Sequence, residues 1–479
     1  MQSLNYDAAI SVSLYLLFIL SISNPDKCVK SPGDVNKVDI LVTNGRVITM
    51  NPEREILDNG FVAIEGNEIS AVKDSSHRHE YTAEKTIDAE GGIVMPGLIN
   101  THTHVSMTVF RSLADDVPDR LHRYIFPLED KLVSRKMVRT GAQLGNIEML
   151  KGGVTTYADM YYFEDEVAET VDEIGMRAVL GETVIKFPVA DADSAQEGIQ
   201  YALDFIDEYK EHPRITPAFA PHAPYTNATE TLQEITDLSR KHDVPVLTHL
   251  AESDQESKVI AKRSGGLSPI EYMSDIGALT SNLVGAHVIN ADERDLSLLK
   301  QNDVGIAHNM SANIKSAKGV APVLKMLEMN MRVGLGTDGP MSGNTLSTID
   351  EFSQVAKVHK LVNEDRSVMP PIKVIEMATI DAARTLHMED QIGSLEQGKL
   401  ADLIVIDAAA PNMVPIYNLY SALVYSTYPP NVEHTIVDGN VLMRDRNMLT
   451  VDEEAVRKSV VRFGDEVRKT VRKMGEVVQ

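Results

Sequence analysis

Short apolar runs alternate with longer amphipathic stretches through the middle of the chain. The amphipathic stretches, such as residues 229–242 and 291–302, carry capping residues and apolar side chains three and four positions apart, which predicts helices. The apolar runs are rich in β-prone residues and predict strands at residues 93–100, 154–160, 178–185, 215–223, 244–252, 283–289, 304–309 and 333–338. Strands that alternate with helices form a parallel sheet, and eight such repeats predict an α/β protein with a (β/α)8 barrel of the TIM type.

Two β-rich segments flank this region. On the N-terminal side, residues 38–50 and 61–72 contain short β-prone runs broken by Asn-Gly and Gly-Asn turns, a pattern typical of small antiparallel sheet. On the C-terminal side, residues 391–407 and 434–443 repeat the pattern. We expect the two ends of the chain to fold together into a composite β-sandwich beside the barrel.

These patterns divide the chain beyond its N-terminal extension into three parts. Residues 37–96 and 385–445 are predicted to form the sandwich, residues 97–384 the barrel, and residues 446–479 a C-terminal segment. Within that segment, residues 450–474 predict an amphipathic helix with a basic outer face. We expect this helix to pack on the barrel or on a neighbouring subunit.

The N-terminal extension, residues 1–36, carries conflicting signals. Residues 8–23 are apolar and uncharged but too short for a comfortable membrane span, and residues 21–23 would serve as a small-residue cleavage site. Residues 1–7, however, contain no Lys or Arg, which a signal peptide requires. A signal peptide, an uncleaved anchor and an over-extended start of the chain all stay open.

Charge and cysteine content narrow the functional classes. The chain has 46 Lys and Arg against 70 Asp and Glu, a net charge of −24, which argues against nucleic acid as a partner. Cys28 is the only cysteine, so no internal disulfide can form. Zinc sites built from paired cysteines, as in cytidine deaminases, are excluded for the same reason.

Residues that can bind a metal ion or transfer a proton follow nearly every predicted strand. The C-terminal ends of barrel strands converge on one mouth, so we expect these side chains to share one site. The residues, from the first to the eighth strand, are His102, His104, His222, His249, Glu252, His287, His308 and Asp338. Histidines elsewhere in the chain fit no strand end and are interpreted as surface or packing residues.

The residue types suit a catalytic metal centre. Three histidines and one carboxylate favour one Zn²⁺, with Fe²⁺ as the second candidate, and zinc lowers the pKa of a bound water to about 7. Asp338 can bind the ion and accept a proton from the water, and Glu252 can protonate a substrate nitrogen. His287 can stabilise the oxyanion-like intermediate through a hydrogen bond. The plainer alternatives are that Glu252 is a surface acid, Asp338 a turn residue and His308 a supporting residue rather than a ligand.

Four short motifs resemble a known family. They are PGLINTHTH at 96–104, THLAE at 248–252, GAH at 285–287 and GTDG at 336–339. In this order they are similar to motifs of the metal-dependent amidohydrolase superfamily. Within it, the chain resembles the branch that holds 5-methylthioadenosine/S-adenosylhomocysteine deaminases and triazine hydrolases. The resemblance covers roughly residues 38–440 and implies a barrel with a composite sandwich.

The resemblance also implies a metal-ligand set. His102, His104, His249 and Asp338 match the ligands of a mononuclear site. The fourth predicted strand, at residues 215–223, contains no lysine. A carbamylated lysine that bridges to a second metal ion is therefore not expected.

Catalytic and substrate-binding residues follow from the same resemblance. Glu252 and His287 match the proton shuttle and the histidine that orients the attacking water, and Asp338 joins them in catalysis. Glu129 matches the acid that binds ribose hydroxyls, and His222 matches a residue that contacts substrate, as Glu252 and Asp338 also do. The implied reaction is hydrolytic deamination of 5-methylthioadenosine, S-adenosylhomocysteine or 5′-deoxyadenosine, in which Glu252 protonates the adenine ring and ammonia leaves.

Two segments depart from the family pattern. Deaminases that take S-adenosylhomocysteine place an arginine just after the third strand, where this chain has Glu182 and only Lys186 nearby. The loop at residues 308–319 lacks the usual proline after His-Asn. The alternative functions are an aminohydrolase or chlorohydrolase acting on guanine, a pterin or an s-triazine, and a non-catalytic scaffold. The resemblance favours the cytoplasm and a small-molecule partner, with a membrane association only if the N-terminal run is an anchor. The surfaces expected to be exposed on the sandwich and the C-terminal helix favour a homo-oligomer.

Overall fold

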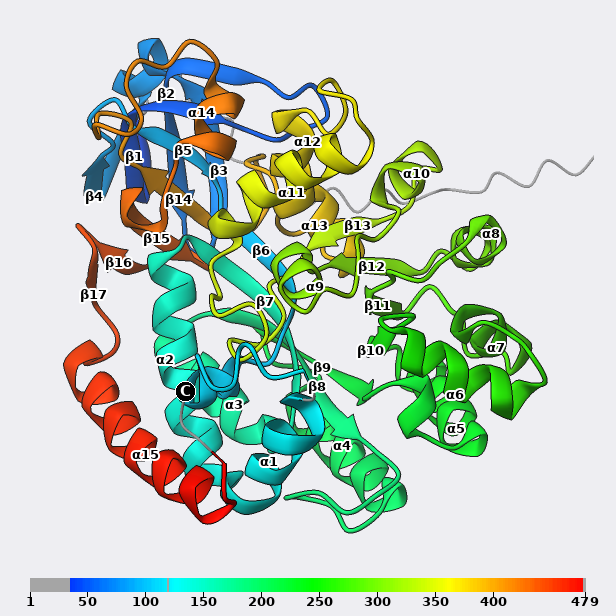
Figure 1. Cartoon of the computed structure of the whole chain (residues 1–479). Helices are drawn as coiled ribbons and strands as arrows, with labels where there is room; N and C mark the ends of the chain where they lie inside the picture. Colours follow the sequence, from blue (N-terminus) through cyan, green and yellow to red (C-terminus); the bar gives the residue numbers. More distant parts are fainter. Residues whose placement is uncertain (1–34, 119, 477–479) are drawn as a thin grey trace, which may run out of the picture.

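The computed structural model describes residues 35–118 and 120–476 (Figure 1). The predicted signal peptide or anchor within residues 1–36 therefore lies outside the described residues, apart from its last two positions. Across the described ranges, no helix combines the length and apolar character needed to cross a membrane.

A parallel sheet of eight strands, counted over the described residues, forms the barrel in chain order. Its strands are β6 (Leu98–Thr103), β7 (Val154–Tyr161), β8 (Arg177–Val184), β9 (Ile215–Pro221), β10 (Val246–Leu250), β11 (Leu283–His287), β12 (Gly305–His308) and β13 (Val333–Leu335). The first and last strands meet where the backbone N–H of Asp338 donates to the carbonyl of His102 over 3.0 Å. Each predicted apolar run overlaps one of these strands, so the predicted barrel is confirmed.

The first apolar run divides at a glycine. β5 (Ile93–Pro96) pairs with strands of the second sheet, whereas β6 opens the barrel at Leu98. Gly97 lies between them, and a Cβ atom there would lie 2.1 Å from the Thr155 hydroxyl. The Pro-Gly pair therefore marks the point where the chain passes from one sheet to the other.

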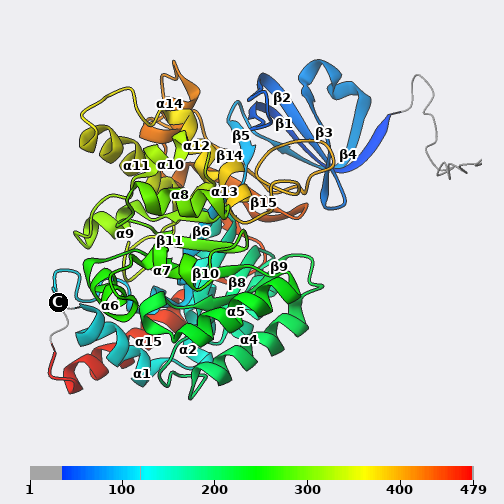
Figure 2. The same ribbon diagram turned by 90° about the vertical axis from the view of Figure 1, so that its right-hand side faces the viewer.

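Helices surround the strands of the barrel (Figures 1 and 2). The predicted helix at 229–242 is present as α5, where Leu232 and Ile235 are buried three positions apart against the barrel. The helices between the first and last parts of the barrel are α1 (Phe126–Leu132), α2 (Arg135–Lys151), α3 (Glu164–Ile174), α4 (Ala195–Tyr209), α5 (Thr229–His242), α6 (Asp254–Ser264), α7 (Pro269–Asp275), α8 (Glu293–Gln301), α9 (Met310–Lys315), α10 (Val323–Glu328), α11 (Thr348–Val362), α12 (Pro371–Ala378) and α13 (Ile380–Thr385).

Both ends of the chain contribute to the second sheet, as predicted for a composite sandwich. Its order is β17-β16-β15-β14-β5-β1-β2-β3, with β4 beside β1. The strands other than β5 are β1 (Asn36–Ile48), β2 (Ile56–Glu65), β3 (Glu68–Asp74), β4 (Tyr81–Asp88), β14 (Leu403–Ile406), β15 (Val432–Val437), β16 (Asn440–Arg444) and β17 (Asn447–Met448). Figure 2 shows β1–β4 projecting away from the helices of the barrel. The domain limits drawn from the sequence stay predictions.

Two details of this sheet correct the sequence interpretation. Asn44-Gly45 is not a turn but lies inside β1, where the register with β2 shifts and Asn44 has a φ of 57°. By contrast, Gly66-Asn67 does connect β2 to β3. The sheet is also mixed rather than purely antiparallel, because β4 and β5 run parallel to β1.

The predicted C-terminal helix is α15 (Glu453–Lys473), and it packs on the barrel. Its apolar residues Phe463, Val467 and Val471 are buried at helical spacing. Figure 1 shows α15 running along α2, and Lys151 at the end of α2 forms an ion pair with Glu453 over 2.5 Å. A second short helix, α14 (Leu419–Tyr425), lies near α11 and α12.

Candidate active site

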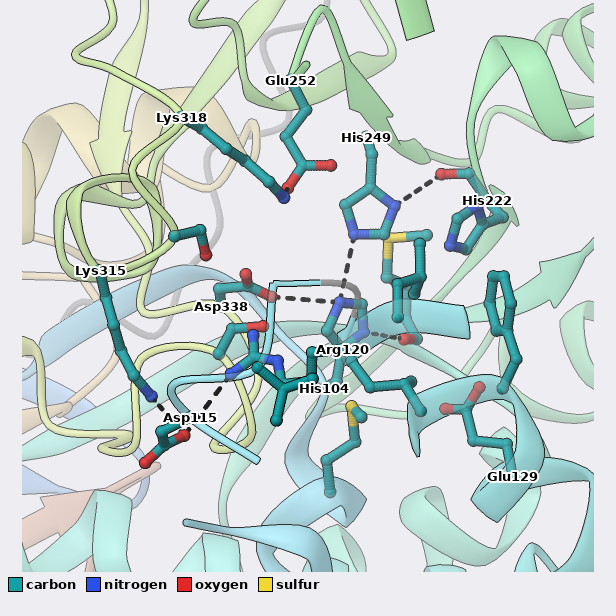
Figure 3. A pocket seen from close by; sticks show the side chains of 18 of the residues that line it. His104, Asp115, Arg120, Glu129, His222, His249, Glu252, Lys315, Lys318 and Asp338 are labelled. Carbon is teal, nitrogen blue, oxygen red and sulfur yellow. Dashed lines mark hydrogen bonds and ion pairs between the residues drawn. The ribbon is translucent and has the colours of Figure 1, made fainter. Parts of the chain in front are cut away.

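A cluster of metal-binding side chains lies at the C-terminal ends of the barrel strands. Potential ligand atoms of His102, His249, His287 and Asp338 all lie within 4.8 Å of one another, and all four residues are buried. His104 borders this group: its Nε2 lies 3.2 Å from Nε2 of His249 and 3.3 Å from Oδ1 of Asp338 (Figure 3). The barrel thus brings together five side chains from the ends of four strands that are far apart in the sequence.

Hydrogen bonds to carbonyl groups fix the protonation of two rings. Nδ1 of His104 lies 2.6 Å from the carbonyl of Met160, and Nδ1 of His249 lies 2.7 Å from that of His222. A carbonyl only accepts, so each Nδ1 carries hydrogen and each Nε2 presents a lone pair to the centre. Two lone pairs 3.2 Å apart require a cation between them. Burial lowers the pKa of His104, but the neighbouring Asp338 outweighs this effect and raises it to about 9, so this position favours a positive charge.

Two buried nitrogen atoms of this cluster have no hydrogen-bond partner among the described residues. They are Nε2 of His102 and Nε2 of His287. Leaving a buried polar atom unpaired costs about 1–3 kcal/mol, so such atoms usually indicate a ligand or a metal ion. Imidazole nitrogens with one carboxylate are the donors that a divalent ion such as zinc or iron prefers. The cluster therefore fits one divalent metal ion.

The four side chains that cluster most tightly in the structure are not the same four that the family resemblance selects as metal ligands. The buried cluster includes His287 and leaves His104 at its edge, whereas the resemblance selects His104 and gives His287 another role. Nε2 of His287 lies 3.6 Å from Oε1 of Glu252, toward the cavity. His104 contacts both His249 and Asp338 directly. The ligand set His102, His104, His249 and Asp338 stays a prediction.

His287 is held by a residue that sequence reasoning missed. Nδ1 of His287 donates to Oδ1 of Asn313 over 2.7 Å, and both side chains are buried. This bond places the ring hydrogen on Nδ1 and leaves Nε2 free to accept. Asn313 lies on α9, and the only sequence signal for it is its position shortly after the seventh strand. His308 is not in the cluster, because its Nε2 faces Nε2 of His359 at 3.2 Å.

Glu252 follows β10 and lines the cavity next to the cluster. Its carboxylate forms an ion pair with Lys318, which lies beyond α9. Burial would raise the pKa of Glu252, but His287 and Lys318 lower it below its ordinary value. The carboxylate is therefore ionised at neutral pH and can accept a proton.

A cavity of about 460 Å³ opens beside the cluster and brings the other predicted residues together. His104, His249 and Asp338 line it, as do Glu129 and His222. The ring of His222 points into the cavity, and its Nδ1 lies 3.1 Å from the hydroxyl of the buried Thr226. Predicted metal-binding and substrate-binding residues therefore share one cavity.

Glu129 is the acid of this cavity on the side of α1. The hydroxyl of Tyr161, on β7, donates to Oε1 of Glu129 over 2.9 Å. Burial raises the pKa of Glu129 to about 7, although Tyr161 and His104 act in the opposite direction. A partly buried carboxylate with unused lone pairs is suited to accept hydrogen bonds from substrate hydroxyls.

Glu182, at the place of the family's arginine, lies outside the cavity lining. It is fully buried and accepts a hydrogen bond from the backbone N–H of Glu164 at the start of α3, over 3.0 Å. Lys186 is exposed, does not line the cavity and donates to the carbonyl of Tyr225 over 3.0 Å. Neither residue replaces the missing arginine.

Comparison with known proteins identifies the family. The family model described as "Amidohydrolase family" matches residues 93–442, which include the barrel, the cluster and the cavity. The chain belongs to the amidohydrolase family. This agrees with the motifs around His102, His249, His287 and Asp338, so the predicted superfamily is confirmed.

Relatives of this amidohydrolase extend over most of its length. It is 41% identical to a 5-methylthioadenosine/S-adenosylhomocysteine deaminase of Syntrophobacter fumaroxidans, across 89% of this chain and 97% of the relative. It is 36% identical to a 5′-deoxyadenosine deaminase of Methanosarcina acetivorans, across 87% of this chain and 96% of the relative. Its structure is similar to that of an adenosine deaminase from Xanthomonas campestris with bound zinc, with a TM-score of 0.89, 30% identity, and coverage of 91% and 100%.

Proposed function

We propose that this amidohydrolase deaminates an adenosine derivative by hydrolysis and releases ammonia. The observation that carries the proposal is the position of Glu129, an acid held by Tyr161 in the same cavity as the metal-binding cluster. The names of the Syntrophobacter and Methanosarcina relatives support a 5-methylthioadenosine or 5′-deoxyadenosine type of substrate. A cytoplasmic location and a homo-oligomeric state stay predictions.

One divalent metal ion would be held by His102, His104, His249 and Asp338. Zn²⁺ is the first candidate, because zinc is bound in the similar adenosine deaminase from Xanthomonas campestris. When bound, such an ion supplies Lewis-acid activation of a water molecule at neutral pH. The facing Nε2 atoms of His104 and His249, together with the carboxylate of Asp338, provide donor atoms for this ion.

Three residues of the chain handle protons and charge around the reacting ring. Glu252 is ionised and lines the cavity, so it can take a proton from the attacking water and deliver it to the adenine ring. Asp338 can share the first of these transfers. Nε2 of His287, which has no hydrogen-bond partner within the described chain, can accept a hydrogen bond from the attacking water and so orient it. Overall, one water is consumed and the C6 amino group leaves as ammonia, which converts the adenine ring to hypoxanthine.

Glu129 provides the specificity for a nucleoside. An ionised carboxylate can accept hydrogen bonds from two neighbouring ribose hydroxyls, and each such charge-assisted bond contributes about 1.5–3 kcal/mol. The bond from Tyr161 uses one oxygen and fixes the orientation of the group. A free base or an s-triazine offers no hydroxyl pair to this carboxylate.

The experiment is ammonia release from purified, metal-analysed protein with a panel of substrates. The panel holds 5-methylthioadenosine, 5′-deoxyadenosine, adenosine, adenine, guanine, a pterin and an s-triazine. We expect turnover of the nucleosides, and we expect Glu129→Gln to reduce their kcat/KM by roughly tenfold or more. Activity confined to guanine, the pterin or the triazine would replace the proposed function with its alternative. No activity on any compound by metal-loaded protein would favour a scaffold.

A further inference from the structure

We infer that the cavity selects adenosine derivatives whose 5′ substituent is uncharged over those whose 5′ substituent carries a carboxylate. The inference rests on the proposed function and names its substrate class more narrowly. Two observations support it. Each lysine and arginine of the cavity lining already pairs with a carboxylate of the same lining, and the wall next to Glu129 is apolar.

The lysine and arginine residues of the lining, within the described part of the chain, are Arg120, Lys315 and Lys318. Lys315 lies 2.8 Å from Oδ1 of Asp115, and Nη1 of Arg120 lies 3.5 Å from the same oxygen. Arg120 also donates to the carbonyl of Met341 over 2.7 Å. Lys318 is paired with Glu252, whose role in proton transfer depends on its position. A substrate carboxylate would have to displace one of these acids to gain a cation.

Asp115 is fixed by a further bond. Its second oxygen, Oδ2, accepts from the side-chain amide of Asn344 over 2.9 Å. Both carboxylate oxygens are thus engaged, and the residue joins three segments: the loop before α1, α9, and the segment after β13. Figure 3 shows Asp115 between Lys315 and Arg120. This arrangement makes displacement of Asp115 by a second carboxylate unfavourable.

Acidic side chains also outnumber lysine and arginine side chains in the lining. Asp116 and Glu129 line the same cavity, and neither has an ion pair with a lysine or arginine among the described residues. A carboxylate that enters therefore leaves water without gaining an unpaired lysine or arginine as its partner. An uncharged substituent does not meet this desolvation penalty.

The wall beside Glu129 offers apolar contacts instead. Ile125 and Phe126 line the cavity and precede Glu129 by four and three positions, which places them on its face of the helix. Leu121 and Val117 extend the same wall along the preceding segment. A group attached to a ribose held by Glu129 therefore lies next to aliphatic and aromatic side chains. A methylthio or methyl group is suited to this surface.

The first test compares kcat/KM of the metal-loaded wild type for 5-methylthioadenosine, 5′-deoxyadenosine and S-adenosylhomocysteine. We expect both uncharged substrates to exceed S-adenosylhomocysteine by about tenfold or more. Equal or faster turnover of S-adenosylhomocysteine would overturn the inference and leave the deaminase function standing. Failure to deaminate any adenosine derivative would overturn both. This measurement requires no variant, so it is independent of folding defects.

A second test changes the pairing itself. Asp115→Asn frees Lys315 and Arg120, while its amide oxygen can still accept from Asn344. We expect the preference for 5-methylthioadenosine over S-adenosylhomocysteine to narrow by about fivefold or more, mainly through a lower KM for S-adenosylhomocysteine. Asp116→Asn is the matched control, because it removes the same charge from the lining without releasing an ion pair; we expect a change below about twofold. An unchanged preference in Asp115→Asn, or equal narrowing in both variants, would overturn the account.

Discussion

Two groups of charged and polar residues lie at opposite ends of the barrel, and they differ in whether all their polar atoms find partners within the chain. Arg177, the first residue of β8, lies at the end away from the cavity. Its Nε is 2.8 Å from Asp402, its Nη2 is 3.0 Å from Asp438, and its Nη1 donates to the carbonyl of Pro213 over 3.1 Å. Asp402 and Asp438 flank β14 and β15, so this group joins the barrel to the second sheet. Each charge of the group has a partner within the chain.

The cluster at the cavity end is incomplete by comparison. Nε2 of His102 and Nε2 of His287 have no hydrogen-bond partner in the described chain, and the lone pairs of His104 and His249 face each other. Asp338 and His287 also have positive φ angles of 61° and 74°, which cost about 1–3 kcal/mol each in residues other than glycine. The difference indicates that the Arg177 group stabilises the fold, whereas the histidine cluster gives up stability to bind something else.

The largest effect is expected from the incomplete cluster. Asp338→Asn removes the only carboxylate of the predicted ligand set, and we expect deamination to fall by about a thousandfold or more, since at least ~4 kcal/mol of transition-state stabilisation is lost. Activity and metal content are measured on the same preparation. A variant that keeps its metal ion and more than a tenth of its activity would contradict the assignment.

Arg177→Met should lower the stability of the protein but leave its catalytic activity nearly unchanged. It leaves the buried Asp402 and the half-buried Asp438 without a cation, so we expect the free energy of unfolding to fall by about 3–5 kcal/mol while kcat of the folded protein stays within about twofold. Chemical denaturation measures the first quantity. Arg468→Met is the control, because Arg468 pairs with Asp465 on the exposed face of α15 and should change stability by less than about 1 kcal/mol. Similar effects of the two substitutions would remove the contrast between the two ends of the barrel.

Asn313 tests whether the orientation of His287 matters. Asn313→Leu removes the acceptor of the Nδ1 hydrogen, so the ring can rotate or change tautomer, and we expect kcat to fall by about 10–100-fold. Asn313→Asp keeps an acceptor at the same place and should restore most of the activity. The measurement is kcat of the two variants under the same conditions. Equal decreases of kcat would mean that the substitutions affect only packing and not the orientation of His287.

The smallest effect concerns Glu129 and pH. Because burial raises its pKa to about 7, the carboxyl group is largely protonated at pH 6 and largely ionised at pH 8. The ionised form accepts hydroxyl groups better, so kcat/KM for 5-methylthioadenosine should rise by up to about tenfold as the pH increases through 7. In Glu129→Gln the part of this increase that comes from Glu129 should be absent. Identical pH profiles for the two proteins would exclude Glu129 as the group responsible.

Much of the fold could be predicted because strand and helix periodicity is local. The eight apolar runs all overlap barrel strands, and the convergence of the histidines that follow them is a consequence of barrel geometry. The error at Asn44-Gly45 arose because the same dipeptide suits a hairpin turn and a bulge inside a strand. Strand β4 was not predicted, since Tyr81–Asp88 is polar at most positions.

The supporting residues of the site could not be predicted from local patterns. Asn313, Lys318 and Asp115 act through partners 26, 66 and 200 or more positions away. These contacts depend on how the loops after β12 and β6 fold over the cavity, and no periodicity encodes this. Tyr161 was likewise invisible, because only the barrel places it against Glu129.

The most direct test of the account measures bound metal and deamination together. The account predicts about one zinc or iron ion per chain, release of one ammonia for each 5-methylthioadenosine converted to its hypoxanthine derivative, loss of activity with a chelator and recovery on adding Zn²⁺. Full deaminase activity in protein that contains no metal ion would contradict the central claim, as would metal-loaded protein that leaves every adenosine derivative unchanged.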